Sequence, residues 1–319
     1  MLRFVGKRIL LTIFTLWIAF TLVFLIFPRD PREVLVAQGI LEPSPDQLEA
    51  VRHQFGYHRP VYIQYIRWLT GYPPADPDEN EDSRVMTEGL LRGDLGFSYK
   101  YSIPVLDLVR EKLPMTLALI GIAILISLLI GIPLGVFSAF RRRTLFDRVI
   151  STGSFFGLYT PIFFLALMGV LIFGTWLGWL PTEGYGGPKW VILPAFVLAA
   201  PETAVVARVM RSSVSFMLVK ADQKKKNSKR KTIISTFIKI LGVTSPRRIF
   251  FLLSWVIVIE VLFSWPGIGS LMLRSAGGMG KDHFTLQGIL LVFVVLVAIM
   301  NLIGDIVNTF LDRRMKGGT

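Results

Sequence analysis

The chain has 319 residues, of which 52% are hydrophobic and 18% are charged, and its mean hydropathy is +0.56. Soluble domains carry about 25% charged residues, so this composition excludes an ordinary soluble domain and indicates several membrane-spanning helices. A net charge of +13 would suggest nucleic-acid binding in a soluble protein, but here the distribution of the charges matters more than their sum. The sequence has no cysteine, which excludes disulfides and thiolate metal sites.

Apolar runs predict the membrane-spanning helices. A helix needs about 20 mostly apolar residues to cross a hydrocarbon core about 30 Å thick. Four runs are strong candidates, and two weaker ones contain proline or glutamate. The predicted spans are residues 9–27, 115–137, a part of 149–180, 190–207, 249–263 and 286–310. We therefore expect an all-α membrane protein with six transmembrane helices.

The first run, within residues 1–27, is predicted to be a retained helix. Arg3, Lys7 and Arg8 precede it, as they would in a cleaved signal peptide, which is the alternative interpretation. The run is longer than a usual signal-peptide core, and residues 27–31 (Phe-Pro-Arg-Asp-Pro) do not resemble a small-residue cleavage site. A membrane anchor fits these features better.

Residues 28–114 form a large insertion between the first two spans, and residues 115–319 hold the other five. In the insertion, Asp46 is the expected N-cap of a short helix, with Glu49 at the capping-box position. Residues 72–82 contain five acidic side chains and no apolar periodicity, so we expect a mobile loop there.

Lysine and arginine are concentrated in alternate loops, which predicts the topology. They precede the first span and recur in residues 141–148, 208–248 and 313–316, whereas the insertion holds most of the acidic residues. By the positive-inside rule, both termini are cytoplasmic and the insertion is extracytoplasmic.

Three acidic residues fall within predicted spans, where charges are costly and usually functional or paired. Glu202 follows a proline and could line a passage or cap a broken helix. Glu260 is expected near the outer interface, where it could reach water. Asp305 forms one helical stripe with Asn301 and Asn308, which either packs against another helix or lines a pathway.

The segment Trp265-Pro266-Gly267-Ile268-Gly269 predicts a tight turn after the fifth span. It is either a re-entrant loop that closes the extracytoplasmic end, with Trp265 in the aromatic belt, or a plain interfacial anchor. The candidates for the pathway or gate are thus Glu202, Glu260, Trp265, Pro266, Gly267, Asn301 and Asp305.

The sequence shows no catalytic or nucleotide-binding machinery. No Gly-x-x-x-x-Gly-Lys-Ser/Thr phosphate loop occurs, and residues 277–282 have the wrong spacing for one. His53, His58 and His283 lack the spacing of a zinc helix, and there is no Gly-x-Ser-x-Gly elbow. We predict no catalytic or metal site, so energy for transport has to come from a partner or an ion gradient.

Six patches of sequence resemble one transporter family in the same order. The most informative joins Arg92-Gly93-Asp94-Leu95-Gly96-Phe97-Ser98 to Leu113-Pro114-Met115-Thr116-Leu117. The others lie in residues 28–31, 55–69, 177–195, 208–213 and 260–269. On these residues the chain resembles, over nearly its whole length, the first of the two permease subunits of oligopeptide/dipeptide/nickel ATP-binding-cassette (ABC) importers.

The resemblance implies a type I ABC importer permease fold in the inner membrane of a prokaryote, with a substrate path near the membrane midplane. It also implies partners: a second homologous permease, two cytoplasmic ATPases that bind ATP and Mg, an extracytoplasmic substrate-binding protein, and membrane lipid. Neither a cofactor nor nucleic acid is expected on this chain. Family substrates include peptides, nickel complexes and oligosaccharides, so the resemblance does not select one.

Members of this family contact their ATPases through a short cytoplasmic helix that ends in glycine and a basic pair. The corresponding loop here, about residues 208–248, departs from that pattern because residues 220–231 are highly basic and contain no glycine. Its lysines either contact the ATPase or form a solvated face attracted to anionic lipid. The end of the motif is best matched within residues 239–248. The coupling candidates are Arg211, Lys239, Gly242, Arg247 and Arg248.

Three classes of function follow from these residues. The leading one is a permease subunit that forms half of the pathway of an ATP-driven importer of peptides or similar solutes. The second is a self-sufficient ion-coupled secondary transporter that uses the intramembrane acids, although the internal repeat typical of that class is not found. The third, a membrane scaffold without transport activity, is supported only by the unusual coupling loop.

Overall fold

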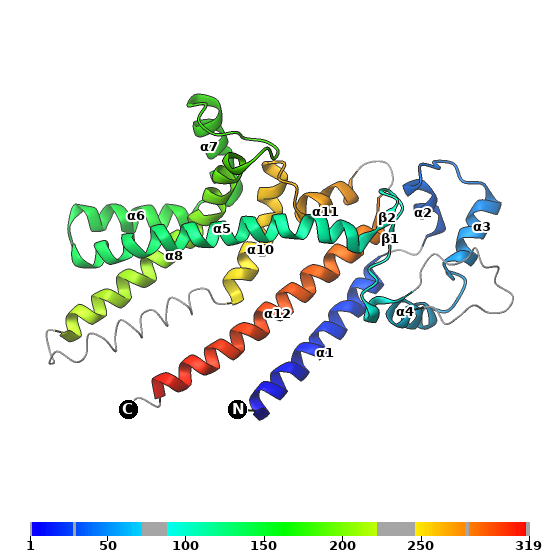
Figure 1. The fold of residues 1–319 in the computed structure, drawn as a ribbon, viewed down its shortest axis with the longest axis horizontal. Coiled ribbons are helices and arrows are strands. Elements are labelled where there is room, and N and C mark those ends of the chain that lie inside the picture. Colours follow the sequence, from blue (N-terminus) through cyan, green and yellow to red (C-terminus); the bar gives the residue numbers. More distant parts are fainter. Residues whose placement is uncertain (1, 28–29, 72–87, 222–245, 278–280, 317–319) are drawn as a thin grey trace. The chain divides into compact units, whose positions relative to one another are not determined.

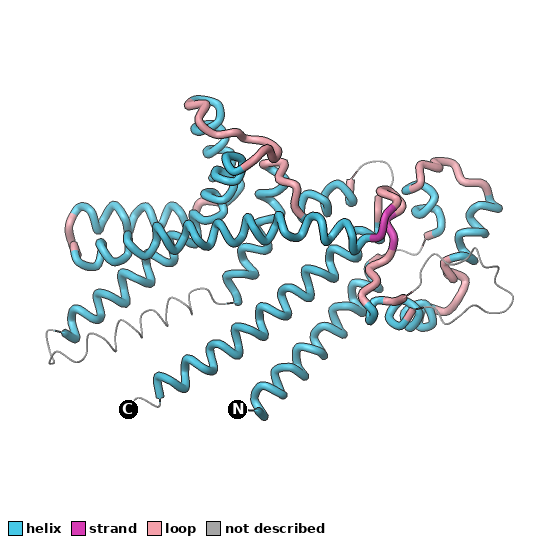
Figure 2. Tube along the Cα trace, in the orientation of Figure 1, coloured by secondary structure: helices cyan, strands magenta, loops and turns pink. Residues whose placement is uncertain are grey.

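The computed structural model describes residues 2–27, 30–71, 88–221, 246–277 and 281–316. Helices dominate these residues (Figure 1), and strand is confined to one short hairpin (Figure 2). The chain divides into a first unit, Met1–Pro114 with Ser270–Ala298, and a second unit, Met115–Gly269 with Ile299–Thr319. The expected loop at residues 72–82 lies outside the described residues.

Among the described residues, four helices are long and apolar enough to cross a membrane. They are Val5–Ile26 within α1 (Leu2–Ile26), α5 (Val105–Phe140), Pro188–Leu218 within α8 (Pro188–Ala221), and His283–Ile306 within α12 (His283–Lys316). A shorter apolar helix, Phe250–Leu262, lies within α10 (Pro246–Leu262). The all-α membrane fold is confirmed, whereas the total of six spans and the division at residues 27 and 114 stay predictions.

The predicted third span is a bent pair of helices. α6 (Leu145–Tyr159) is followed by α7 (Ile162–Gly169) and the π-helical η3 (Val170–Trp176), and the two parts meet at 108°. The break falls at Thr160-Pro161, because proline disfavours helical geometry in the residue before it and has no N–H to donate. The apolar run at 149–180 therefore folds as two helices bent at a proline, either a broken span or a re-entrant loop.

The first unit carries the small helices of the insertion, namely α2 (Pro31–Ala37), α3 (Pro45–Gln54) and α4 (Val61–Thr70), with the short 3₁₀ helix η2 (Leu90–Arg92). The expected N-cap of α3 was wrong, since the cap is Ser44 and not Asp46. Ser44 Oγ accepts from the Gln47 amide, and Gln47 Oε1 accepts from the Ser44 amide. The capping box therefore begins two residues earlier, with Pro45 in the first helical position, where its missing N–H costs nothing.

An aromatic cluster joins these helices to the start of α12. Val34 and Leu35 of α2 are buried against Val51 and Phe55 of α3, with the rings of Tyr57, Tyr99 and Phe284 packed beside them. The β1–β2 hairpin (Phe97–Ser98 with Ile103–Pro104) is tied to α12 by a 2.5 Å hydrogen bond from the buried Ser98 hydroxyl to Asp282. Asp282 also accepts from the amide of Thr285, so one carboxylate caps α12 and anchors the hairpin.

In the second unit, α6 and α8 pack together, and α5 approaches α8 closely. A Cβ on Gly135 of α5 would overlap the backbone of Ala207, so only glycine allows this approach. Ala139, Val206, Met210 and Val214 form the buried contact between the two helices. Small residues at a crossing are the usual means of bringing membrane helices together.

Candidate functional site

The Glu260 carboxylate lies at the end of α10 and is completely buried. One carboxylate oxygen accepts a 2.6 Å hydrogen bond from the Thr116 hydroxyl, and the other accepts a 2.6 Å bond from the Gly269 amide. The Thr116 oxygen in turn accepts from the Ile268 amide at 2.9 Å. We call Glu260, Thr116, Ile268 and Gly269 the Glu260 cluster. It satisfies the first amides of α11 (Ile268–Ala276), which would otherwise lack partners.

The turn between α10 and α11 is held against three other parts of the second unit. The Trp265 indole N–H donates to the Met115 carbonyl at 3.1 Å, and its ring meets Tyr185 edge-on at 5.0 Å. The Gly184 amide donates to the Phe263 carbonyl at 2.9 Å. Gly267 packs directly against the Glu260 carboxylate, and a Cβ there would overlap it. The polar groups of this irregular turn thus find partners within the protein, as they must wherever water is excluded.

Two expectations for this turn were wrong. Glu260 does not reach water, because the turn folds back over its carboxylate. Trp265 is only 2% exposed and is not free to act as an interfacial anchor, because its indole is enclosed and hydrogen-bonded within the unit. Pro266 is partly exposed at the tip of the turn. Sequence reasoning found these residues, but it did not find Thr116, whose place in the cluster depends on a contact 144 positions away.

A second buried carboxylate lies at the turn between α5 and α6. Asp147 accepts a bidentate pair of bonds from Arg211 of α8, at 2.6 Å from Nε and 2.8 Å from the second terminal nitrogen. It also accepts from the Ser138 hydroxyl at 2.5 Å and from the Arg143 amide at 3.0 Å. We call these four residues the Asp147 cluster. Arg211, predicted as a coupling residue, thus ties α8 to the α5–α6 turn.

The other candidates are placed without being brought together by a described contact. Glu202 is buried in α8, which continues through Pro194 and Pro201, so the alternative in which it caps a broken helix is wrong. Asn301 is exposed and Asp305 is partly buried on α12. Arg247 and Arg248 fall in the first turn of α10. Lys239 and Gly242, with most of the basic run 220–231, lie outside the described residues.

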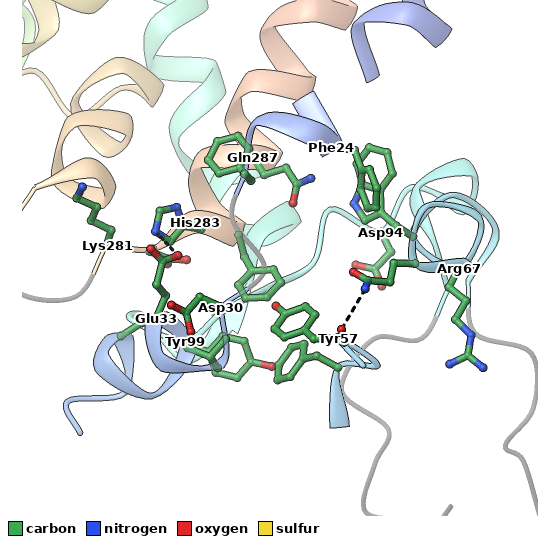
Figure 3. Close-up of a pocket in the computed structure, with 18 of the residues that line it drawn as sticks. Phe24, Asp30, Glu33, Tyr57, Arg67, Asp94, Tyr99, Lys281, His283 and Gln287 are labelled. Atoms are coloured by element: carbon green, nitrogen blue, oxygen red, sulfur yellow. Dashed lines mark hydrogen bonds and ion pairs between the residues drawn. The ribbon is translucent and has the colours of Figure 1, made fainter. Parts of the chain in front are cut away.

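The first unit contains a pocket that sequence reasoning missed (Figure 3). Aromatic side chains from α1, α3, α4 and the hairpin line it, with polar groups among them: Phe24, Phe55, Tyr57, Trp68, Tyr99, Asp30, Glu33, Gln64, Arg67 and His283. His283 Nε2 lies 2.8 Å from a Glu33 oxygen, and Gln64 donates to the Tyr57 and Arg59 carbonyls at 3.3 and 2.7 Å. The aromatic residues at 55–65 were the only sign of this pocket in the sequence. Only the tertiary structure brings them together with residues 24 and 283.

Helices of membrane-spanning length, together with an irregular turn sealed by a buried carboxylate, define a multi-pass membrane protein. Two family descriptions match it: "Binding-protein-dependent transport system inner membrane component" over residues 131–317, and the N-terminal component of the same systems over residues 1–120. The chain therefore belongs to the family of ABC importer inner-membrane permeases, which confirms the resemblance seen in the sequence.

Curated relatives agree over almost the entire chain. A Brucella abortus (strain 2308) protein named as a peptide transport system permease is 30% identical, with 97% of this chain and 98% of the relative covered. The glutathione transport system permease protein GsiC of Escherichia coli O6:H1 is 30% identical, with 99% of each covered. The oligopeptide transport system permease protein AppB of Bacillus subtilis (strain 168) is 29% identical, with 91% and 90% covered.

Proposed function

We propose that this chain forms half of the translocation pathway of an ATP-driven importer of peptides or similar small solutes. The observation that carries the proposal is the match of both family descriptions across the chain, supported by relatives named for peptide, oligopeptide and glutathione transport. The sequence has no phosphate-binding loop, and in this proposal separate subunits supply the energy.

The proposed assembly contains a second homologous permease, two cytoplasmic ATPases that bind ATP and Mg, and an extracytoplasmic substrate-binding protein. The chain lies in the inner membrane of a prokaryote with both termini in the cytoplasm, as the lysine and arginine distribution favours. In this arrangement residues 28–114 face the binding protein.

The Glu260 cluster is proposed to hold the gate-forming turn at the extracytoplasmic end. Its hydrogen bonds join α5, α10 and α11, so a movement of any one helix is passed to Trp265, Pro266 and Gly267. Glu202, Asn301 and Asp305 are proposed to line the pathway.

Arg211 is proposed to act in coupling as a tie and not as a docking residue. Its guanidinium is engaged by Asp147, so a displacement of the cytoplasmic loop after α8 is transmitted to the α5–α6 turn. Direct contact with the ATPase is assigned to Lys239, Gly242, Arg247 and Arg248. Replacing Gly242 by isoleucine should lower transport-coupled ATP hydrolysis without preventing membrane insertion.

Reconstitution tests the proposal. Vesicles that hold this chain with its permease partner, ATPases and binding protein should accumulate peptide when ATP is supplied, whereas vesicles with this chain alone should not. Accumulation by the chain alone under a proton gradient would support the ion-coupled alternative instead.

A further inference from the structure

The helix α4 of the first unit has its apolar side facing outward. Val61, Tyr62 and Ile66 are 50%, 65% and 54% exposed. Two polar residues of the same helix, Gln64 and Arg67, are partly buried and line the aromatic pocket instead. A helix on a water-exposed domain normally shows the reverse arrangement. The outward surface of α4 is therefore matched to an apolar medium.

α4 is fixed to one end of the membrane-spanning α1. The hydroxyls of Thr21 and Tyr65 lie 2.7 Å apart, and the Phe24 ring contacts the rings of Tyr65 and Trp68 at 5.0 and 5.2 Å. The apolar span of α1 covers 22 residues, Val5–Ile26, which is about the length that the hydrocarbon core requires. Its Ile26 end, and α4 with it, therefore lies at the level of the membrane boundary.

We infer that α4 is an interfacial helix whose outward face, defined by Val61, Tyr62 and Ile66, inserts into the lipid of the adjoining leaflet. Lipid is the occupant because α4 packs against the apolar span of α1, on which Leu22, Leu25 and Ile26 are also exposed. Tyr62 on this face is of a residue type enriched at the headgroup level. Leu91 on η2, which packs against α4, is also exposed.

This placement would give the insertion a contact with the bilayer. The helix that contacts lipid with one face supplies a wall of the aromatic pocket with the other, through Gln64, Arg67 and Trp68. The bilayer thus fixes the position of that wall.

Spin labelling tests the inference. Because the chain has no cysteine, Tyr62→Cys, Ile66→Cys and Val61→Cys each place one nitroxide on an otherwise unlabelled chain. Ala50→Cys, at an exposed position of α3, is the matched control in the same unit. The full chain, assembled with its partner subunits, is reconstituted in phospholipid vesicles, and the accessibility of each label to oxygen and to a water-soluble nickel chelate is measured.

Labels at positions 61, 62 and 66 should show a several-fold higher ratio of oxygen to nickel accessibility than the label at position 50. A ratio equal to that at position 50 would place α4 in water and overturn the inference. Labels shielded from both reagents would overturn it in favour of a protein partner. Each variant must elute with the same subunits as the parent complex, and the three α4 positions give independent readings if one variant fails to assemble. The measurement reports location alone, so it stands apart from the outcome of the transport assay.

Discussion

Two of the buried carboxylates in the second unit, Glu260 and Asp147, are satisfied by different kinds of partner. Glu260 is satisfied by a hydroxyl and a backbone amide among its partners, and it organises an irregular turn. Asp147 is satisfied by a guanidinium together with a hydroxyl and an amide, and it organises the junction of three helices. The Arg211 side chain is 36% exposed, whereas Glu260 has no exposed surface.

The difference indicates two kinds of mechanical element. A bidentate ion pair with one partly solvated member can loosen and reform, because water replaces some of the lost interaction. The Glu260 carboxylate is buried under its own turn, where water cannot replace its partners. If it moved alone, the groups that donate hydrogen bonds to it would be left unsatisfied. The Glu260 cluster is therefore expected to move as a rigid piece, and the Asp147 cluster to act as an adjustable joint.

Glu260→Ala is the substitution from which we expect the largest effect on stability and uptake. The Thr116 hydroxyl and the Gly269 amide would lose their acceptor, at a cost of about 1–3 kcal/mol for each buried donor. We expect the largest fall in the melting temperature of the purified complex, with loss of peptide uptake. Glu260→Gln keeps one carbonyl acceptor and should fall between the parent and the alanine variant. Equal behaviour of the alanine variant and the parent would contradict a structural role for this carboxylate.

Gly267→Ala tests the same cluster from the side of the turn. Its methyl group would occupy space taken by the Glu260 carboxylate, so either the carboxylate or the turn must shift. Overpacking of this kind typically costs about 1–3 kcal/mol. Uptake should fall, with a smaller loss of stability than in Glu260→Ala. The matched control is Gly153→Ala in α6, where an added Cβ meets nothing within 4 Å.

The sequence predicts the apolar helices well because they depend mainly on composition. The runs at 9–27, 115–137, 190–207, 249–263 and 286–310 are helical where the structure describes them, except at the end residues Phe27 and Phe263. The ends are predicted less well: α5 begins at Val105 and α8 continues to Ala221, because helix propensity carries both past the apolar segment.

The site is predictable only in part, for a physical reason. Glu260 stands out because a charge within a span is costly, and Gly267 because it lies in an evident turn. Neither property names Thr116 or Asp147 as part of a cluster. Their contacts join segments far apart in the chain, and a single sequence contains no information about which distant hydroxyl or guanidinium will face a given carboxylate.

The joint at Asp147 can be sharpened by a double-mutant cycle with Asp147→Asn and Arg211→Ala. The coupling energy should be about 1–2 kcal/mol, between the values for exposed and fully buried pairs, because only one partner is solvated. It should shrink as salt is raised from 0.1 to 1 M, since screening acts on the exposed member. The unfolding midpoint of each variant is the measurement. A coupling energy that is insensitive to salt would indicate that the Asp147 cluster is as inaccessible to water as the Glu260 cluster.

The smallest effect is expected from Trp265→Phe. This variant tests whether the turn between α10 and α11 depends on the Trp265 indole as well as on the Glu260 carboxylate. Phenylalanine keeps an aromatic ring against Tyr185 but cannot donate to the Met115 carbonyl. Losing that one bond should cost about 1 kcal/mol, visible as a small drop in melting temperature with uptake retained. If instead uptake falls as far as in Glu260→Ala, the indole and the carboxylate hold the turn jointly. The rigid piece would then extend to Met115 at the start of the second unit, and the contrast with the Asp147 joint would become sharper.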